Sequence, residues 1–358
     1  MQRRGRWQMK KLIVKSSKTY QIILSKALLD EAGKYIASVV SGKNIYVITD
    51  DIVDSLYFTI LEISLIDSGF NVFKYVIPNG EKSKNSSNYI SILNDMADKD
   101  ISKTDTVIAL GGGVPGDLAG FVAATYLRGI NLVQMPTTLL AAVDSSVGGK
   151  TAIDLDKGKN LAGAFYQPNM VLCDLSLMDT LSDQVFNDGC AEVIKYGIIG
   201  GEPLFEKLAK PIKLQLEDIV YSCVKMKRDI VQQDELDTNI RHILNFGHTV
   251  GHAIELLSNY EISHGTAVAK GMSVITKASY NLGLCNESTV IQIDSLISSY
   301  GFDLNPIFNP TDLAKAILMD KKRNNDYINL VLVKEIGQCV IKKTNMSELT
   351  NILQKAIG

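Results

Sequence analysis

The first half of this chain alternates short β-rich runs with helix-like stretches, and this alternation restricts the fold more than any other feature. The β-rich runs lie at 45–49, 72–76, 106–110 and 131–135, and the helix-like stretches include 52–68 and 86–98. Strands that alternate with helices are typical of βαβ units, which build a parallel sheet. We therefore expect an α/β fold that begins with a Rossmann-like parallel-sheet domain over 9–180.

The second half has a different pattern, in which strand signals fade and amphipathic helical segments follow one another. These segments are 190–200, 217–233, 241–258, 266–282, 288–300 and 311–319, and one short β-like run lies at 329–333. This pattern predicts a mainly α-helical domain over 181–358. A chain of 358 residues with 46% hydrophobic residues is long enough for two such domains, with a cleft between them.

Charge and cysteine usage restrict the partners and the compartment. The 37 Lys and Arg residues nearly balance the 39 Asp and Glu residues, so neither nucleic acid nor a membrane surface is indicated, and small molecules are favoured. The five cysteines are scattered singly, which fits the reducing cytoplasm. The basic start lacks the apolar run of a signal peptide. We interpret 1–8 as a disordered or non-native extension ahead of a native start at Met9.

A glycine-rich run follows the third β-rich segment and opens a helical pattern, which is where bare N–H groups favour a phosphate. Gly111, Gly113 and Gly116 match the spacing G-x-G-x-x-G, although that match alone is weak and a tight turn without a ligand would also explain it. Thr137 and Thr138 follow the next β-rich run and would lie at the same edge of the sheet. Their alternative role is a plain helix cap.

Charged residues gather in the glycine-containing segment that follows. Asp144, Lys150, Lys159 and Asn160 lie where apolar periodicity is weak, so we expect a loop that presents them to an anion. Lysines exposed to solvent on an ordinary surface loop are the alternative.

Polar residues in the second half recur at helical spacing. Arg241, Asn245, His248 and His252 would share one face of a helix over 241–258, which either faces solvent or lines a polar cleft. His242 lies off this face, and we expect an ordinary histidine there.

A carboxylate and two imidazoles are a usual ligand set for a catalytic zinc ion. His248 and His252 are the first pair that the spacing offers. Glu192 lies within an apolar helical pattern, one turn before Lys195, and a buried Glu needs a partner. Either a salt bridge with Lys195 or a metal would provide one.

Taken together, these residues resemble the 3-dehydroquinate synthases, within the sugar-phosphate cyclase superfamily. The matching pieces are GGGVPGDLAGF (111–121), YLRG (126–129), PTTLL (136–140), VDSSVGGKT (143–151), GKN (158–160), GAFYQP (163–168), GCAEVIKYG (189–197), LNFGHTVGHAIE (244–255) and SHG (263–265). The resemblance implies conversion of 3-deoxy-D-arabino-heptulosonate 7-phosphate to 3-dehydroquinate and phosphate in the shikimate pathway. It also implies catalytic NAD and a divalent metal, with zinc the first choice and cobalt the second.

The resemblance also implies the site residues. The metal ligands become Glu192, His248 and His264, and His252 becomes a contact to the substrate and a proton-transfer group. The remaining substrate contacts would be Asp144, Lys150, Asn160, Lys195, Lys227, Arg241, Asn245 and Lys322, with Arg128 supplied by the neighbouring subunit of a homodimer. The implied NAD contacts are Asp50, Asn79, Gly80, Glu81, Lys82, Ser83, Lys84, Gly113, Val114, Pro115, Gly116, Asp117, Thr137, Thr138, Lys150, Lys159, Leu177, Met178, Asp179 and Thr180.

Five positions depart from the family's common pattern, and none is a proposed metal ligand. They are Asn79, Pro115, Leu177, Ser182 and Thr266. Pro115 lacks an N–H group and so removes one donor to a pyrophosphate. The rival functions are a sister cyclase such as 2-deoxy-scyllo-inosose or valiolone-type synthase, a metal-dependent polyol dehydrogenase and a catalytically silent relative.

Overall fold

A computed structural model describes residues 9–321 and 327–357 of the chain. These residues fold as two compact units. The first comprises the chain up to Ser182 together with Lys227–Glu235, and the second comprises Asp183–Met226 and the chain from Leu236 onwards. No helix among the described residues is long and apolar enough to cross a membrane.

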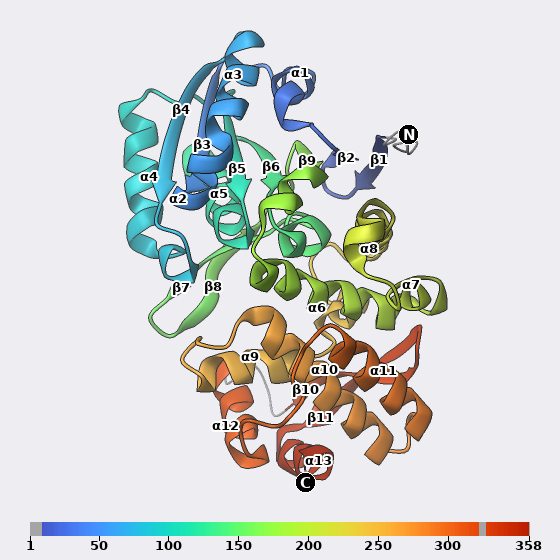
Figure 1. Cartoon of the computed structure of the whole chain (residues 1–358). Coiled ribbons are helices and arrows are strands. Elements are labelled where there is room, and N and C mark those ends of the chain that lie inside the picture. The colour runs from blue at the N-terminus through green and yellow to red at the C-terminus, as the bar shows by residue number, and fades with distance from the viewer. Residues whose placement is uncertain (1–8, 322–326, 358) are drawn as a thin grey trace, which may run out of the picture. The chain divides into compact units, whose positions relative to one another are not determined.

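The first unit is built on a seven-stranded sheet, shown from blue to green in Figure 1. All neighbouring strands are parallel except the first two, which form an antiparallel hairpin at one edge. In spatial order the strands are β1 (Lys10–Lys15), β2 (Thr19–Ser25), β9 (Met170–Asp174), β6 (Asn131–Pro136), β5 (Thr106–Gly111), β3 (Asn44–Asp50) and β4 (Asn71–Ile77). The predicted α/β fold with a mostly parallel sheet is confirmed.

Helices cover both faces of this sheet because its central strands are apolar on both sides. In β3, Ile45 and Val47 pack with one core cluster, whereas Tyr46 and Ile48 pack with the other. The first cluster includes residues of α1 (Ala32–Ala37) and α3 (Thr59–Asp67), and the second includes residues of α4 (Ser86–Asp98) and α5 (Gly113–Thr125). Shorter helical turns are η1 (Leu29–Glu31), α2 (Asp51–Val53), η2 (Asp54–Phe58), η3 (Glu81–Ser83), η4 (Tyr126–Arg128), η5 (Ala141–Ser145) and η6 (Leu175–Thr180).

The segment that we expected to be a loop forms an antiparallel hairpin instead. Its strands are β7 (Lys150–Leu155) and β8 (Gly158–Phe165). Thr151, Ala152 and Ile153 are buried, and a Cβ added to Gly120 in α5 would meet Thr151 Cγ2 at 2.3 Å. The expectation failed because three consecutive residues of β7 are buried, with Thr151 against Gly120 of α5. This strand therefore lacks the alternation of apolar and polar residues by which a strand is recognised in a sequence.

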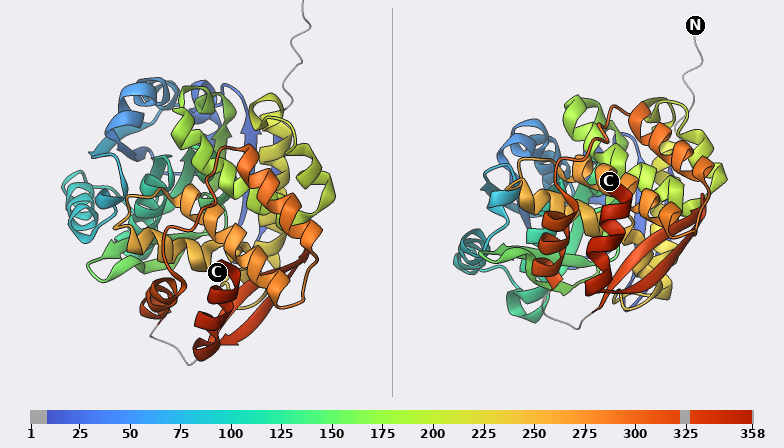
Figure 2. Two further views of the ribbon diagram at one scale, coloured as in Figure 1. Left: turned by 60° about the horizontal axis from the view of Figure 1, so that its bottom comes forward. Right: turned by 90° about the horizontal axis from the view of Figure 1, so that it is seen from below.

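The second unit is mainly helical, as predicted. Its elements are α6 (Asp183–Gly200), α7 (Glu202–Lys207), η7 (Ile212–Gln215), the start of α8 (Leu216–Gln233), η8 (Ile240–Asn245), α9 (His248–Leu257), α10 (His264–Asn281), α11 (Glu287–Ser299), α12 (Pro310–Lys321), β10 (Tyr327–Glu335), β11 (Gln338–Asn345) and α13 (Met346–Ile357). The late β-like run becomes β10, which pairs with β11, and this red hairpin lies beside α13 in Figure 2.

The segment 227–235, which contains the end of α8, belongs to the first unit, and two of its side chains bind that unit's edge hairpin. Gln232 Oε1 accepts a hydrogen bond from the N–H of Lys15 (2.7 Å), and Glu235 accepts bonds from the N–H and the hydroxyl of Ser17. The segment 227–235, which the sequence pattern placed in the helical half, therefore packs with the sheet.

The single helix expected over 241–258 is interrupted. The 3₁₀ turn η8 ends at Asn245, and α9 begins at His248. Gly247 between them has φ 78°, a left-handed conformation that glycine adopts without steric cost. The expected stripe of Arg241, Asn245, His248 and His252 on one helix face is therefore wrong.

Candidate metal centre and nucleotide site

The glycine-rich run forms the strand–turn–helix that its sequence predicts. β5 ends at Gly111, and α5 begins at Gly113. A Cβ added to Gly111 would meet Pro115 Cγ at 2.5 Å, so only glycine fits beneath this ring. Pro115 lies in the first turn of α5, where an N–H would have no partner within the helix, so proline is tolerated. The first-turn N–H groups of Gly113 and Val114 are the donors that this helix end offers to an anion.

The two threonines after β6 differ in their roles. Thr138 Oγ1 accepts a hydrogen bond from the N–H of Ala141 (3.2 Å), which is the cap that we gave as the alternative. The N–H of Thr137 donates to the carbonyl of Gly111 (2.9 Å), but the Thr137 hydroxyl is buried without a hydrogen-bond partner. A buried hydroxyl without a partner is costly, and a bound polar ligand would satisfy it.

Asp50 ends β3 at the same edge of the sheet and caps the helical turn that follows. Its carboxylate accepts hydrogen bonds from the N–H groups of Ile52 (3.1 Å) and Val53 (2.9 Å). Burial raises the pKa of Asp50 above its usual value, against the effect of these bonds. Asp50 is therefore held rigidly before any ligand binds.

A network of opposite charges surrounds Lys84, which is buried. Its ammonium lies 2.8 Å from Glu81, 3.1 Å from Asp117 and 3.9 Å from Asp154. Burial alone would lower the pKa of Lys84, but Asp117 and Glu81 raise it above its usual value. Lys159 of β8 extends the network, because its ammonium lies 3.8 Å from Glu81. The network joins three segments that carry predicted NAD contacts.

The other predicted NAD contacts are positioned as follows. The N–H of Asn79 donates to Asp51 (3.1 Å), the hydroxyl of Ser83 donates to the carbonyl of Pro78 (2.5 Å), and Gly80 has φ 107°. Leu177 and Met178 are buried, so their side chains pack in the interior rather than lying open to a ligand. Lys82, Asp179 and Thr180 are exposed, and Gly116 and Asp117 are half-buried in α5.

Among the predicted substrate contacts, Asp144 and Lys227 form an ion pair within the first unit, and Lys227 Nζ also donates to the carbonyl of Asp144 (2.6 Å). Lys150 and Asn160 are exposed in the β7–β8 hairpin, and Asn160 has a left-handed φ of 56°. Arg128 is exposed after α5. Lys322 lies outside the described residues.

In the second unit, the side chains of Glu192, His248 and His264 converge. Glu192 Oε1 lies 3.2 Å from Nε2 of His248 and 3.2 Å from Nε2 of His264. Glu192 is fully buried in α6 and also forms an ion pair with Lys195, which is one of the two partners that the sequence left open. Lys195 and the imidazoles hold the pKa of Glu192 well below its usual range although burial acts in the opposite direction.

The second nitrogen of each imidazole has its own acceptor. His248 Nδ1 lies 3.2 Å from the carbonyl oxygen of Phe246, and His264 Nδ1 lies 3.2 Å from Glu255 Oε2. If each Nδ1 donates its proton there, both Nε2 lone pairs face the same carboxylate oxygen. Three lone pairs repel one another unless a cation or a proton lies among them, so the residues present fit a divalent metal.

The pKa of His264 agrees with this interpretation. Burial disfavours the imidazolium of His264, but hydrogen bonds to Glu192 and Glu255 outweigh it and raise the pKa of His264 to about 10. The cluster therefore attracts positive charge in the absence of a metal.

Close helix packing at glycines brings the two histidines together. A Cβ on Gly271 of α10 would meet the carbonyl oxygen of Gly247 at 2.1 Å, and one on Gly251 of α9 would meet Val268 Cα at 3.1 Å. At the N-terminus of α10, a Cβ on Gly265 would meet the carbonyl oxygen of Asp188 in α6 at 2.4 Å. The glycines beside the histidines are the sequence signal for this geometry.

Two residues near the metal cluster extend it. His252 is exposed on α9, and Glu255 is buried one turn later. His252, Glu255 and His264 form a second group whose potential ligand atoms lie within 4.8 Å of one another. Arg241 is buried in η8 and Asn245 is half-buried. The contact of Glu255 with His264 was not predicted from the sequence.

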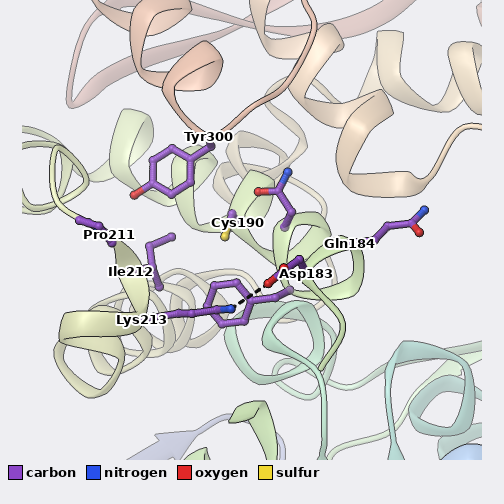
Figure 3. Close-up of a pocket in the computed structure, with 9 residues that line it drawn as sticks. Asp183, Gln184, Cys190, Pro211, Ile212, Lys213 and Tyr300 are labelled. Atoms are coloured by element: carbon purple, nitrogen blue, oxygen red, sulfur yellow. Dashed lines mark hydrogen bonds and ion pairs between the residues drawn. The ribbon is translucent and has the colours of Figure 1, made fainter. Parts of the chain in front are cut away.

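A pocket of about 450 Å³ in the same unit lies elsewhere (Figure 3). It is lined by Asp183, Gln184, Phe186, Asn187, Cys190, Pro211, Ile212, Lys213 and Tyr300. None of the predicted site residues lines it, so it carries no argument about the reaction.

Two family models match consecutive parts of the chain. Residues 74–188 match a family model described as 3-dehydroquinate synthase N-terminal, and residues 189–323 match one described as 3-dehydroquinate synthase C-terminal. The chain is 46% identical over 336 residues to a curated 3-dehydroquinate synthase from Clostridium perfringens (strain 13 / Type A), which covers 92% of this chain and 96% of that protein.

Solved structures with this fold include both cyclases and dehydrogenases. A 2-deoxy-scyllo-inosose synthase, solved with carbaglucose-6-phosphate, NAD+ and Co2+, is 24% identical with a TM-score of 0.86, over 97% of this chain and 100% of that one. A glycerol dehydrogenase from Schizosaccharomyces pombe is 15% identical with a TM-score of 0.62, over 98% of this chain and 91% of that one. At these identities the likeness shows the fold alone.

Proposed function

Since this chain belongs to the 3-dehydroquinate synthase family, we propose that it converts 3-deoxy-D-arabino-heptulosonate 7-phosphate to 3-dehydroquinate and phosphate. This makes it a phosphate-eliminating carbon–oxygen lyase. The observation that carries the proposal furthest is the convergence of Glu192, His248 and His264 on a shared point in a chain whose other half offers a glycine-rich nucleotide turn.

We propose NAD and one divalent metal, zinc or cobalt, as cofactors. Glu192, His248 and His264 would hold the metal, and the Gly113 and Val114 N–H groups with the Thr137 hydroxyl would bind the dinucleotide. When bound, the metal supplies Lewis-acid polarisation of the substrate hydroxyls, and the dinucleotide supplies a reversible hydride acceptor.

The chain's own residues would bind the substrate through charge. Lys150, Lys195, Lys227 and Arg241 are cations that suit a carboxylate and a phosphate dianion, and Lys322 and Arg128 would add to them. Asn160 and Asn245 would orient hydroxyl groups. This arrangement requires no separate strong carboxylate base, because the substrate phosphate can accept the proton itself.

The side chains of Asp144 and His252 have distinct roles in this proposal. The carboxylate of Asp144 holds the ammonium of Lys227 in place before the substrate arrives. The exposed His252 would move a proton at an imidazole nitrogen, since its side chain lies beside the metal cluster on α9.

The assay that tests this function measures phosphate release and NADH absorbance together, with the heptulosonate phosphate as substrate. We expect phosphate release without net accumulation of NADH. Stoichiometric accumulation of NADH would indicate a polyol dehydrogenase. Turnover of a different sugar phosphate, with none of the heptulosonate phosphate, would indicate a sister cyclase.

We further propose a cytoplasmic homodimer in which Arg128 reaches the site of the neighbouring subunit. Its exposure and the free thiols of all five cysteines support these two statements. Arg128→Ala and Glu192→Gln should each be inactive alone. Mixed and reassembled, they should recover about a quarter of the wild-type activity, because one site in each mixed dimer is intact. Mixing without recovery would count against the shared site.

A further inference from the structure

The hairpin β7–β8 is irregular at Asp154. Ile153 pairs with Ala162 and Leu155 pairs with Gly158, so Asp154 alone lies opposite the three residues 159–161 and the register shifts between the two pairs. The extra residues of this β-bulge lie on β8, and the ladder is interrupted beside Asp154. The N–H of Asp154 donates to the carbonyl of Lys84 (2.7 Å), outside the hairpin.

The side chain of Asp154 makes a second set of contacts. Its Oδ1 accepts a hydrogen bond from the N–H of Asn160 (2.8 Å) and lies 3.9 Å from the ammonium of Lys84. Asn160 has φ 56°, a left-handed conformation that asparagine tolerates better than most residues with a Cβ. The hydrogen bond to the carboxylate of Asp154 stabilises the backbone of Asn160 in this conformation.

These contacts are part of a connected set of ion pairs. Asp154 binds Lys84, Lys84 binds Glu81 (2.8 Å), and Lys159 of β8 lies 3.8 Å from Glu81. The helical turn η3 and the tip of the hairpin are therefore fixed to each other from two sides. Asp154 is the residue that bonds to both through its main chain and its side chain.

We propose that Asp154 is a positioning residue, which holds the segment 79–84 and the hairpin residues Lys159 and Asn160 in the geometry that binds the dinucleotide and the substrate. The proposal rests on the proposed function, since that function assigns ligand contacts to these segments. Asp154 itself touches neither ligand in this proposal.

The carboxylate can be removed without damage to the core. In Asp154→Ala the N–H can still donate to Lys84, but Asn160 loses its acceptor and Lys84 loses one of three anions. In Asp154→Asn the side-chain oxygen can still accept from Asn160, so the geometry is retained. Asp156→Ala is the matched control, because Asp156 is exposed at the turn of the same hairpin.

The experiment measures NAD affinity by calorimetry and amide hydrogen exchange of residues 150–165 in the ligand-free enzyme. We expect Asp154→Ala to weaken NAD binding about tenfold or more and to speed exchange at the hairpin tip, as the loss of a charged hydrogen bond predicts. Asp154→Asn should stay within about threefold of the wild type, and Asp156→Ala should match it. Thermal unfolding should change little in all three.

Two results would overturn the proposal. One is wild-type NAD affinity in Asp154→Ala, and the other is unchanged exchange of the hairpin in that variant. A wild-type enzyme that binds no NAD would instead refute the proposed function. Hydrogen exchange in the ligand-free protein would then still decide whether Asp154 anchors the hairpin.

Discussion

Glu255 Oε2 lies 3.2 Å from Nδ1 of His264, and the Nε2 atom of the same ring faces Glu192. A carboxylate on one imidazole nitrogen fixes the tautomer and the ring orientation, so the other nitrogen is presented to a metal. Glu255 therefore orients a proposed metal ligand, from a position on α9 that the sequence alone did not single out.

Glu255→Ala should weaken zinc binding by about 10- to 100-fold, because His264 loses the acceptor that orients it. Glu255→Gln should lose less, since its carbonyl oxygen can still accept from Nδ1. Competition with a chelator of known affinity measures the change. Glu261→Ala, at an exposed position, is the control. Equal zinc affinity in the Ala variant and the wild type would remove Glu255 from the site.

Loss of a metal ligand should reduce metal binding more than loss of Glu255, which orients one of the ligands. We expect Glu192→Gln and His264→Ala each to purify with little bound metal, because each leaves only two of three donor groups. His242→Ala should keep its full metal content, since His242 pairs with Asp237 instead. Mass spectrometry of the metal content per chain makes this measurement. Full occupancy in Glu192→Gln would contradict the assignment.

Gly111→Ala should weaken NAD binding by about tenfold, because the new Cβ would meet Pro115 Cγ at 2.5 Å and displace the start of α5. Adding Pro115→Ala removes that ring atom and should restore part of the affinity. Calorimetric titration of NAD into the single and double variants tests this coupling. Independent, additive losses in the double variant would show that the two residues do not act through this contact.

Asp105 ties the starts of two strands, since it accepts hydrogen bonds from the N–H groups of Asn44 (3.0 Å) and Ser102 (2.7 Å). Burial opposes ionisation here, but these bonds outweigh it and lower the pKa of Asp105. A lowered folded-state pKa stabilises the fold above the unfolded-state value, and the contribution disappears as pH falls through the folded-state value.

We therefore expect Asp105→Asn to cost about 1–3 kcal/mol of unfolding free energy at pH 7. The difference from the wild type should begin to shrink below about pH 4. Urea denaturation at several pH values gives both quantities. A difference that stays constant from neutral pH to pH 3 would show that the charge of Asp105 is not responsible.

Local sequence patterns were sufficient for the elements whose residues interact with near neighbours. Short stretches of the sequence were enough to predict the strands β3, β4, β5 and β6 and the turn at Gly111–Gly113. Alternation of strands with helices and glycine-rich turns can both be recognised in such stretches. The same patterns gave the helices of the second half, and the resemblance to a family supplied the triad of Glu192, His248 and His264.

Contacts between residues far apart in the chain decided the rest. The break at Gly247, the hairpin at Lys150–Phe165 and the docking of 227–235 on the sheet depend on which surfaces meet, and Gly120, Gly251 and Gly271 allow those surfaces to approach. Periodicity reports how one segment divides between core and solvent, but not which segment it packs against. The sequence by itself therefore determined four of the sheet's strands, most of the helices and the chemical groups of this protein. Only the tertiary structure decided that Glu255 supports His264 and that Asp154 binds both Lys84 and Asn160, because these bonds join groups that no local pattern relates.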